Sequence, residues 1–157
     1  MKKVISVLFC LLLLAACGSN QPSESTDSSA AETPPVYTEP WLQVDYGPAD
    51  AAVDLVDNTE DYATPVIFSP CCPLKNFRYA EITAVETEDS IGYQLGEILH
   101  TIPDFSPDAS FTVTMGWIGL FANRAVIFTA PDGTEVYYSV EVSGKDGSVY
   151  LLAFEPV

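Results

Sequence analysis

Large apolar residues alternate with small or polar ones in the second half of the chain. Between residues 111 and 117, Phe111, Val113, Met115 and Trp117 are separated by two threonines and a glycine. Successive side chains of a strand point to opposite faces, so a period of two places these four on one side. The pattern predicts a strand whose apolar face belongs to the core.

Three further apolar segments follow, at residues 124–129, 135–142 and 149–154. Within the second, alternation divides the side chains into an apolar face and a more polar one: Val136, Tyr138, Val140 and Val142 against Glu135, Tyr137, Ser139 and Glu141. Turn residues separate the three segments, at 131–133 and at 144–147. Because turns this short join antiparallel neighbours, we expect the last three strands to form a meander.

The first half of the chain gives a weaker signal. Residues 64–69 and 77–85 are rich in β-branched and aromatic side chains, and 91–95 alternates, so each predicts a strand. We expect the strand that begins at residue 91 to continue through residue 100. Two prolines and two aspartates predict a loop over 102–109. Proline at position 48, with small apolar residues at helical spacing, predicts one short helix over 48–56.

These elements predict a mainly β fold: an antiparallel sheet that forms a small sandwich or partial barrel, with at most one short helix. An α+β roll is the alternative. Residues 41–157 are enough for a single domain with its own core. Residues 17–40 are rich in Ser, Thr, Pro and acidic residues and have no Lys or Arg. Such a stretch buries too little apolar surface to order itself, so we predict a disordered tether.

The first 16 residues pair two lysines, Lys2 and Lys3, with an apolar run too short to span a bilayer. This arrangement indicates a signal peptide that is removed from the mature protein. The run ends in Leu14-Ala15-Ala16-Cys17, which resembles the lipobox of bacterial lipoproteins. The resemblance implies cleavage before Cys17 and lipidation of that cysteine. It therefore implies attachment to the cell membrane, facing outside the cytoplasm. An ordinary secretion signal with a chance cysteine is the alternative.

Charge narrows the choice of partners. The chain has 22 acidic and six basic residues, a formal net charge of −16. Removal of the signal peptide takes away two of the lysines and none of the acidic residues. A surface this negative repels nucleic acid, so we predict no nucleic-acid partner. An envelope protein or a small ligand remains possible as a partner, and the lipid on Cys17 would supply the membrane contact.

Cys71 and Cys72 are adjacent, and Pro70 and Pro73 bracket them. Outside the cytoplasm a disulfide between them, or burial of the pair, is the favoured interpretation. Lys75 and Arg78 nearby would favour a thiolate if the thiols are free, so a thiol redox site or a soft-metal site is the alternative function. The two-residue spacing of common redox motifs is missing, and the pair has too few nearby His or Cys to complete a metal site.

The segment Trp117–Phe121 is apolar and contains glycine. Trp117 continues the alternation of the strand before it and is expected in the core, while Leu120 and Phe121 could form an exposed patch. Exposed apolar patches mark binding surfaces, so we predict a possible binding surface at Trp117, Leu120 and Phe121.

The sequence shows no catalytic constellation. His100 is the only histidine and has no nucleophile motif beside it. Carboxylates cluster at residues 54–61, 86–89 and 104–108, and we interpret them as solvated loop charge. We therefore predict no catalytic residue, no metal and no cofactor. The leading hypothesis is a non-enzymatic lipoprotein whose β domain binds a partner or ligand.

Overall fold

A computed structural model describes residues 40–88, 90–117 and 120–157 of the chain. Every regular element in these ranges is a β-strand, and together the strands form two sheets that do not close into a barrel. The predicted mainly β sandwich is confirmed. The signal peptide, Cys17 and the tether up to residue 39 lie outside the described residues.

The first sheet has four strands in the order β1-β3-β6-β2. They are β1 (Leu42–Tyr46), β2 (Leu55–Val56), β3 (Thr64–Pro70) and β6 (Phe111–Met115). β3 pairs antiparallel with both β1 and β6, whereas the short β2 runs parallel to β6. The predicted alternation of β6 is confirmed, because Phe111, Val113 and Met115 are all buried in the core.

The second sheet has five strands in the order β5-β4-β7-β8-β9. They are β4 (Leu74–Glu86), β5 (Ile91–Phe105), β7 (Arg124–Thr129), β8 (Glu135–Val142) and β9 (Val149–Ala153). β7, β8 and β9 form the expected antiparallel meander. Its two turns contain Gly133 and Gly147 at φ of 88° and 73°, a conformation that glycine adopts without steric cost.

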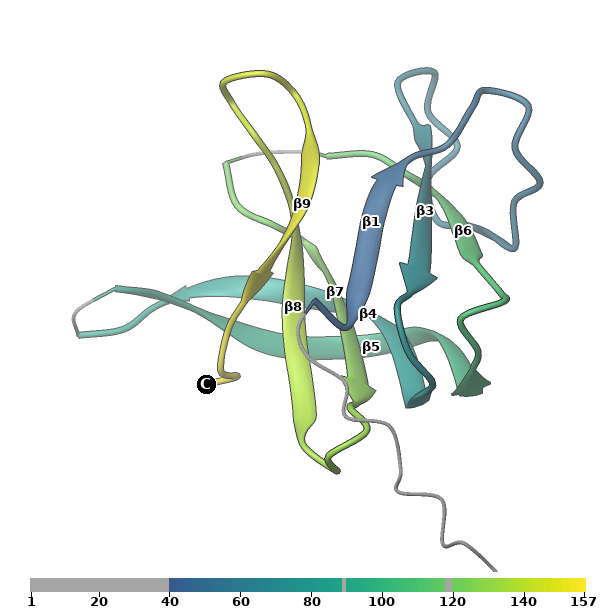
Figure 1. Ribbon diagram of the computed structural model, residues 1–157. Coiled ribbons are helices and arrows are strands. Elements are labelled where there is room, and N and C mark those ends of the chain that lie inside the picture. Colours follow the sequence, from purple (N-terminus) through teal and green to yellow (C-terminus); the bar gives the residue numbers. More distant parts are fainter. Residues whose placement is uncertain (1–39, 89, 118–119) are drawn as a thin grey trace, which may run out of the picture. The chain divides into compact units, whose positions relative to one another are not determined.

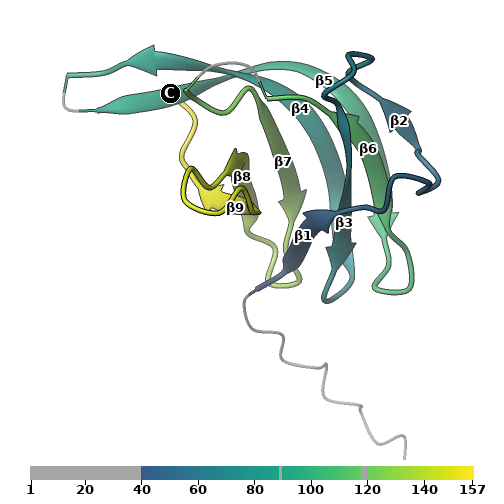
Figure 2. The same ribbon diagram turned by 90° about the horizontal axis from the view of Figure 1, so that it is seen from above.

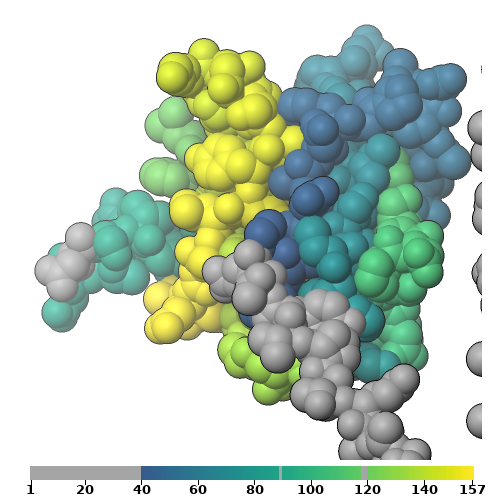
Figure 3. Space-filling view, viewed as in Figure 1, coloured from purple at the N-terminus to yellow at the C-terminus, as the bar shows by residue number. Residues whose placement is uncertain are grey.

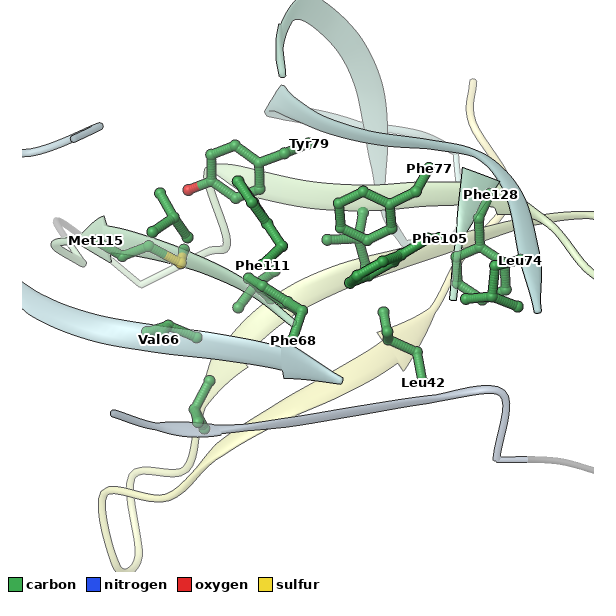
Figure 4. Packing of buried hydrophobic residues seen from close by; sticks show 14 of the residues in the cluster. Leu42, Val66, Phe68, Leu74, Phe77, Tyr79, Phe105, Phe111, Met115 and Phe128 are labelled. Carbon is green, nitrogen blue, oxygen red and sulfur yellow. The ribbon is translucent and has the colours of Figure 1, made fainter. Parts of the chain in front are cut away.

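Aromatic side chains fill the space between the sheets (Figure 4). Phe111 from β6 packs against Phe77 and Tyr79 from β4, with ring centroids 5.6 and 5.9 Å apart. Phe77 also lies 4.8 Å from Phe105 at the end of β5. Full burial of such a ring stabilises a fold by about 1.5–3 kcal/mol. This cluster is therefore the main reason that the two sheets stay together.

The two sheets also approach each other along one side, where β1 lies beside β9 (Figure 1). In the space-filling view the dark blue surface of β1 lies directly against the yellow surface of the C-terminal strands (Figure 3). The Tyr46 hydroxyl at the end of β1 donates a hydrogen bond of 2.9 Å to the Gly147 carbonyl before β9.

β4 and β5 form a long hairpin whose tip projects beyond the other strands (Figure 2). Register shifts interrupt their pairing between Tyr79 and Ile82, where the hairpin begins to leave the main core. Past that point, Tyr93 of β5 meets the C-terminal segment through a bridge to Pro156. A second, smaller apolar cluster lies here, around Ile82, Ala122 and Ala125.

The predicted helix over residues 48–56 is wrong. The chain makes a turn in which the Ala51 amide donates to the Pro48 carbonyl, and then enters β2. The Asp54 amide donates to the Thr112 carbonyl at 2.8 Å, and the Thr112 amide donates to the Asp54 carboxylate at 2.9 Å. These contacts cover the edge of β6, and that long-range pairing outweighs a weak local preference for helix.

The predicted loop over residues 102–109 begins too early, because β5 continues to Phe105. Phe105 is 2% exposed and pairs with Leu74, so burial of its ring extends the strand. Pro103 is tolerated because β5 lies at the edge of its sheet, where alternate backbone amides point away from β4 and have no strand partner, and Pro103 has no partner in the β4 register.

Candidate functional site

The predicted binding surface lies on the loop that joins β6 to β7. Leu120 and Phe121 are 94% and 51% exposed, whereas Trp117 is half-buried and packs against the main core. The indole of Trp117 meets the ring of Tyr46 edge-on, with centroids 5.9 Å apart. Residues 118 and 119 lie outside the described residues. Trp117 thus belongs to the fold, and Leu120 and Phe121 are the members of the segment that a partner could reach.

The first end of this loop is held by close packing at Gly116. A Cβ atom at this position would lie 2.7 Å from both the side-chain nitrogen Nδ2 of Asn58 and a ring carbon of Tyr62. Only glycine fits such an approach without a shift of its neighbours. The backbone amide of Asn58 donates to the Thr114 carbonyl at 3.0 Å. The segment after β2 therefore packs against the residues where the loop leaves β6 and fixes their position.

The second end is held by an ion pair between Arg124 and Asp57. Arg124 donates from Nε to Oδ2 at 2.6 Å and from Nη2 to Oδ1 at 2.9 Å, a two-point geometry that fixes both side chains. Their side chains are only 17% and 10% exposed. The Tyr79 hydroxyl donates to the same carboxylate at 2.8 Å. Asp57 follows β2, so the contact also joins the first sheet to the second.

The environment around Asp57 changes the pKa of the two groups that donate to it, Tyr79 and Arg124. Burial, followed by the negative charge of Asp57, raises the pKa of the Tyr79 hydroxyl far above its usual range. Hydrogen bonding to Asp57 raises the pKa of Arg124. Both groups therefore keep their protons near neutral pH and act as hydrogen-bond donors to the carboxylate. The interpretation of the acidic cluster at 54–61 as solvated is wrong for Asp57, because folding brings Arg124 to it from a distant part of the chain.

Cys71 and Cys72 occupy the turn between β3 and β4. The structure has both as thiols, with Cys71 exposed and Cys72 packed in the core at 2% exposure. Burial, followed by the proximity of Cys71, raises the pKa of Cys72. The accessible thiol of the pair is therefore that of Cys71.

The cations expected to activate these thiols already have carboxylate partners. Lys75 pairs with Asp104 across β4 and β5, and Arg78 pairs with Glu135 of β8. In the described part of the chain, no group of three or more His, Cys, Asp or Glu side chains is arranged to hold a metal ion. The thiols also lie far from the loop with Leu120, since Cys71 follows the end of β3 whereas Met115 pairs with its first residue.

His100 is half-buried in β5 and stacks on Phe111, with centroids 4.7 Å apart and planes 6° from parallel. His100 is therefore partly packed against the aromatic core.

Sequence reasoning missed a groove on the outer face of the second sheet. It has a volume of about 690 Å³ and lies where β9 ends, between the first residues of β8 and the segment after Ala153. Tyr137 and Phe154 contribute aromatic rings to it, and Glu135 and Glu155 contribute carboxylates. The alternation of β8 placed Glu135 and Tyr137 on one face, but nothing local indicated that Phe154 would lie beside them.

Comparisons with protein-family models, with curated proteins and with solved structures found no match. None of the residues described here belongs to a helix that could cross a membrane.

Proposed function

We propose that this protein is a bacterial lipoprotein. A lipid on Cys17 holds it to the cell membrane, facing outside the cytoplasm, and its β sandwich serves as a non-enzymatic binding module. The lipobox-like sequence before Cys17 supports the anchor. A single acyl chain holds a protein only weakly, so a stable anchor needs the two or three chains that lipoproteins receive. The acidic tether would keep the domain clear of the membrane surface.

The exposure of Leu120 and Phe121 is the observation that carries the binding role. Two adjacent large apolar side chains, 94% and 51% exposed, contribute little to the core of their own domain. The loop that bears them is fixed at Gly116 and at Arg124, so the pair is presented from a rigid base. A fixed base lowers the entropy lost on binding. The partner that fits this surface is an envelope protein or a small ligand with an apolar patch, and not a nucleic acid.

The anchor is tested by metabolic labelling with a fatty-acid analogue. Wild-type protein should take up label and sediment with membranes, whereas a Cys17→Ala variant should lose the label and appear in the soluble fraction. Membrane attachment of the Cys17→Ala variant with label still bound would refute the lipoprotein assignment.

The binding surface is tested by a Phe121→Ser variant, with Ile98→Ser as the matched control. Ile98 is 40% exposed and lies on β5, which β4 separates from β7, the strand that follows the loop, so its substitution removes a comparable apolar surface at another position. Cross-linking in intact cells should give a protein adduct with the wild type and the Ile98→Ser variant. The adduct should weaken with Phe121→Ser while the melting temperature stays the same. Equal adducts from all three proteins would rule out this surface.

A further inference from the structure

The groove on the outer face of the second sheet is an open place in the β ladder. β9 pairs with β8 only from Tyr138 to Val142, so the first three residues of β8 extend beyond the end of β9. One more ladder bond follows, from the Phe154 amide to the Tyr137 carbonyl at 3.1 Å. The C-terminal segment then turns toward β5, where Pro156 bridges to Tyr93. The space that a longer β9 would occupy is the groove.

The backbone at the floor of this groove is suited to pairing with another strand. In an antiparallel strand, alternate residues direct their amide and carbonyl groups to the same edge. Since the Tyr137 carbonyl faces the C-terminal segment, the backbone groups of Glu135 face the same edge, beyond the last bond to Phe154. An extended peptide that enters the groove would meet these groups, as in strand addition to an exposed sheet edge.

Aromatic rings form a wall that is already in place. Phe154 meets Tyr93 and Tyr137 edge-on, with centroids 5.4 and 6.0 Å away. The Tyr137 hydroxyl donates to the Glu135 carboxylate, and the Tyr93 hydroxyl donates to Glu141 at 3.1 Å. Each ring is thus held by a neighbour, and a ligand would not need to order them.

The charge of the groove favours a cation. Glu135 is paired with Arg78, but among the described residues no ion pair to Glu155 is found, and Glu155 is exposed beside Phe154. The formal net charge of the chain, −16, adds a long-range attraction for basic ligands. A lysine or arginine side chain can lay its aliphatic stem on an aromatic ring and reach a carboxylate with its charged end.

We propose that this groove binds a short, extended peptide segment that carries a basic side chain. Its backbone pairs with the free edge of β8 at Glu135, and its ammonium or guanidinium group lies over Phe154 and approaches Glu155. The residues that line this groove do not include Leu120 or Phe121, and the proposal does not depend on the lipid anchor.

The test is titration calorimetry on the full chain in detergent at low ionic strength. The probes are five-residue peptides, acetylated and amidated at their ends, with β-branched residues around a central lysine or a central glutamate. The lysine peptide should bind and the glutamate peptide should not. A lysine peptide whose alternate backbone amides are methylated keeps its charge but cannot pair with a strand, and it should fail to bind.

Two variants locate the binding. Glu155→Gln should weaken the lysine peptide about fivefold, as expected for the loss of one charge pair near a surface. Glu60→Gln removes an exposed carboxylate elsewhere and should leave the affinity unchanged. The proposal is overturned if the lysine peptide does not bind. It is also overturned if the glutamate peptide or the methylated peptide binds with the same affinity as the unmodified lysine peptide. Equal effects of the two variants would also overturn it.

Discussion

The two faces of the second sheet both carry aromatic side chains, but they bury them to different degrees. On the inner face Phe77, Tyr79 and Phe128 have no measurable exposure. On the outer face Tyr93, Tyr137 and Phe154 are each only half-buried. The inner face is covered by the first sheet, whereas the outer aromatic residues meet the hairpin, the C-terminal segment and the small cluster that includes Ala122 and Ala125.

The difference shows how one sheet can provide both stability and a binding surface. An aromatic ring in the inner cluster has neighbours from several strands, so little room remains for a ligand. The outer rings touch one another and leave a groove beside them. We therefore expect substitutions on the inner face to reduce mainly stability, and substitutions on the outer face to reduce mainly binding.

The largest effect is expected for Phe77→Ala on the inner face. Phe77 is fully buried among Phe68, Phe105 and Phe111, so its truncation leaves a cavity that the two sheets cannot easily close. The free energy of unfolding should fall by about 3–5 kcal/mol. Urea denaturation followed by tryptophan fluorescence measures this change. A loss below about 1 kcal/mol would contradict the assignment of this cluster as the main core.

A smaller effect is expected for Phe154→Ala, the matching substitution on the outer face. Phe154 is half-buried and keeps two edge-on aromatic contacts, so the loss should be about 1–2 kcal/mol. The same denaturation experiment compares it directly with Phe77→Ala. Equal losses for the two variants would show that the outer cluster is as essential to the fold as the inner one.

The smallest effect concerns the dependence of stability on pH at Glu135. A hydrogen bond from Tyr137, together with the charge of Arg78, lowers the pKa of Glu135 below its ordinary value of 4.5. A carboxylate whose pKa is lower in the folded state stabilises the fold above its unfolded pKa. That contribution is lost as the pH falls through the folded value.

Wild-type protein should therefore lose slightly more stability than a Glu135→Gln variant between about pH 5 and about pH 3. Denaturation curves of both proteins across this range provide the measurement. Because Glu135 is largely exposed, the difference should be small. Parallel pH profiles would indicate that the contacts of Glu135 with Tyr137 and Arg78 do not form in solution.

Periodicity and turn residues predicted most of the strands. In β6 the spacing of Phe111 and Val113, and in β8 that of Val136 and Val140, identified the face that meets the core, because strand geometry alone fixes which side chains share a face. Gly133 and Gly147 marked the turns of the meander for a similarly local reason.

The failures of prediction involve contacts between distant parts of the chain. The segment 48–56 had a weak helical pattern but lies along the edge of β6, about 60 residues away in sequence. Asp57 looked like one of several solvated carboxylates until folding placed Arg124 and Tyr79 around it. The exposure of Leu120 and Phe121 was left open by the sequence, since an apolar loop can point either inward or outward.

The sequence by itself determined most of the strands, which of their side chains share a face, and how negative the molecule is. Each of these follows from local backbone geometry or from composition. Only the tertiary structure decided which face would be covered, which carboxylate would be paired, and where β9 would stop short of the end of β8. Those outcomes depend on which distant segments come together, and the pattern of any single segment contains no information about its partner.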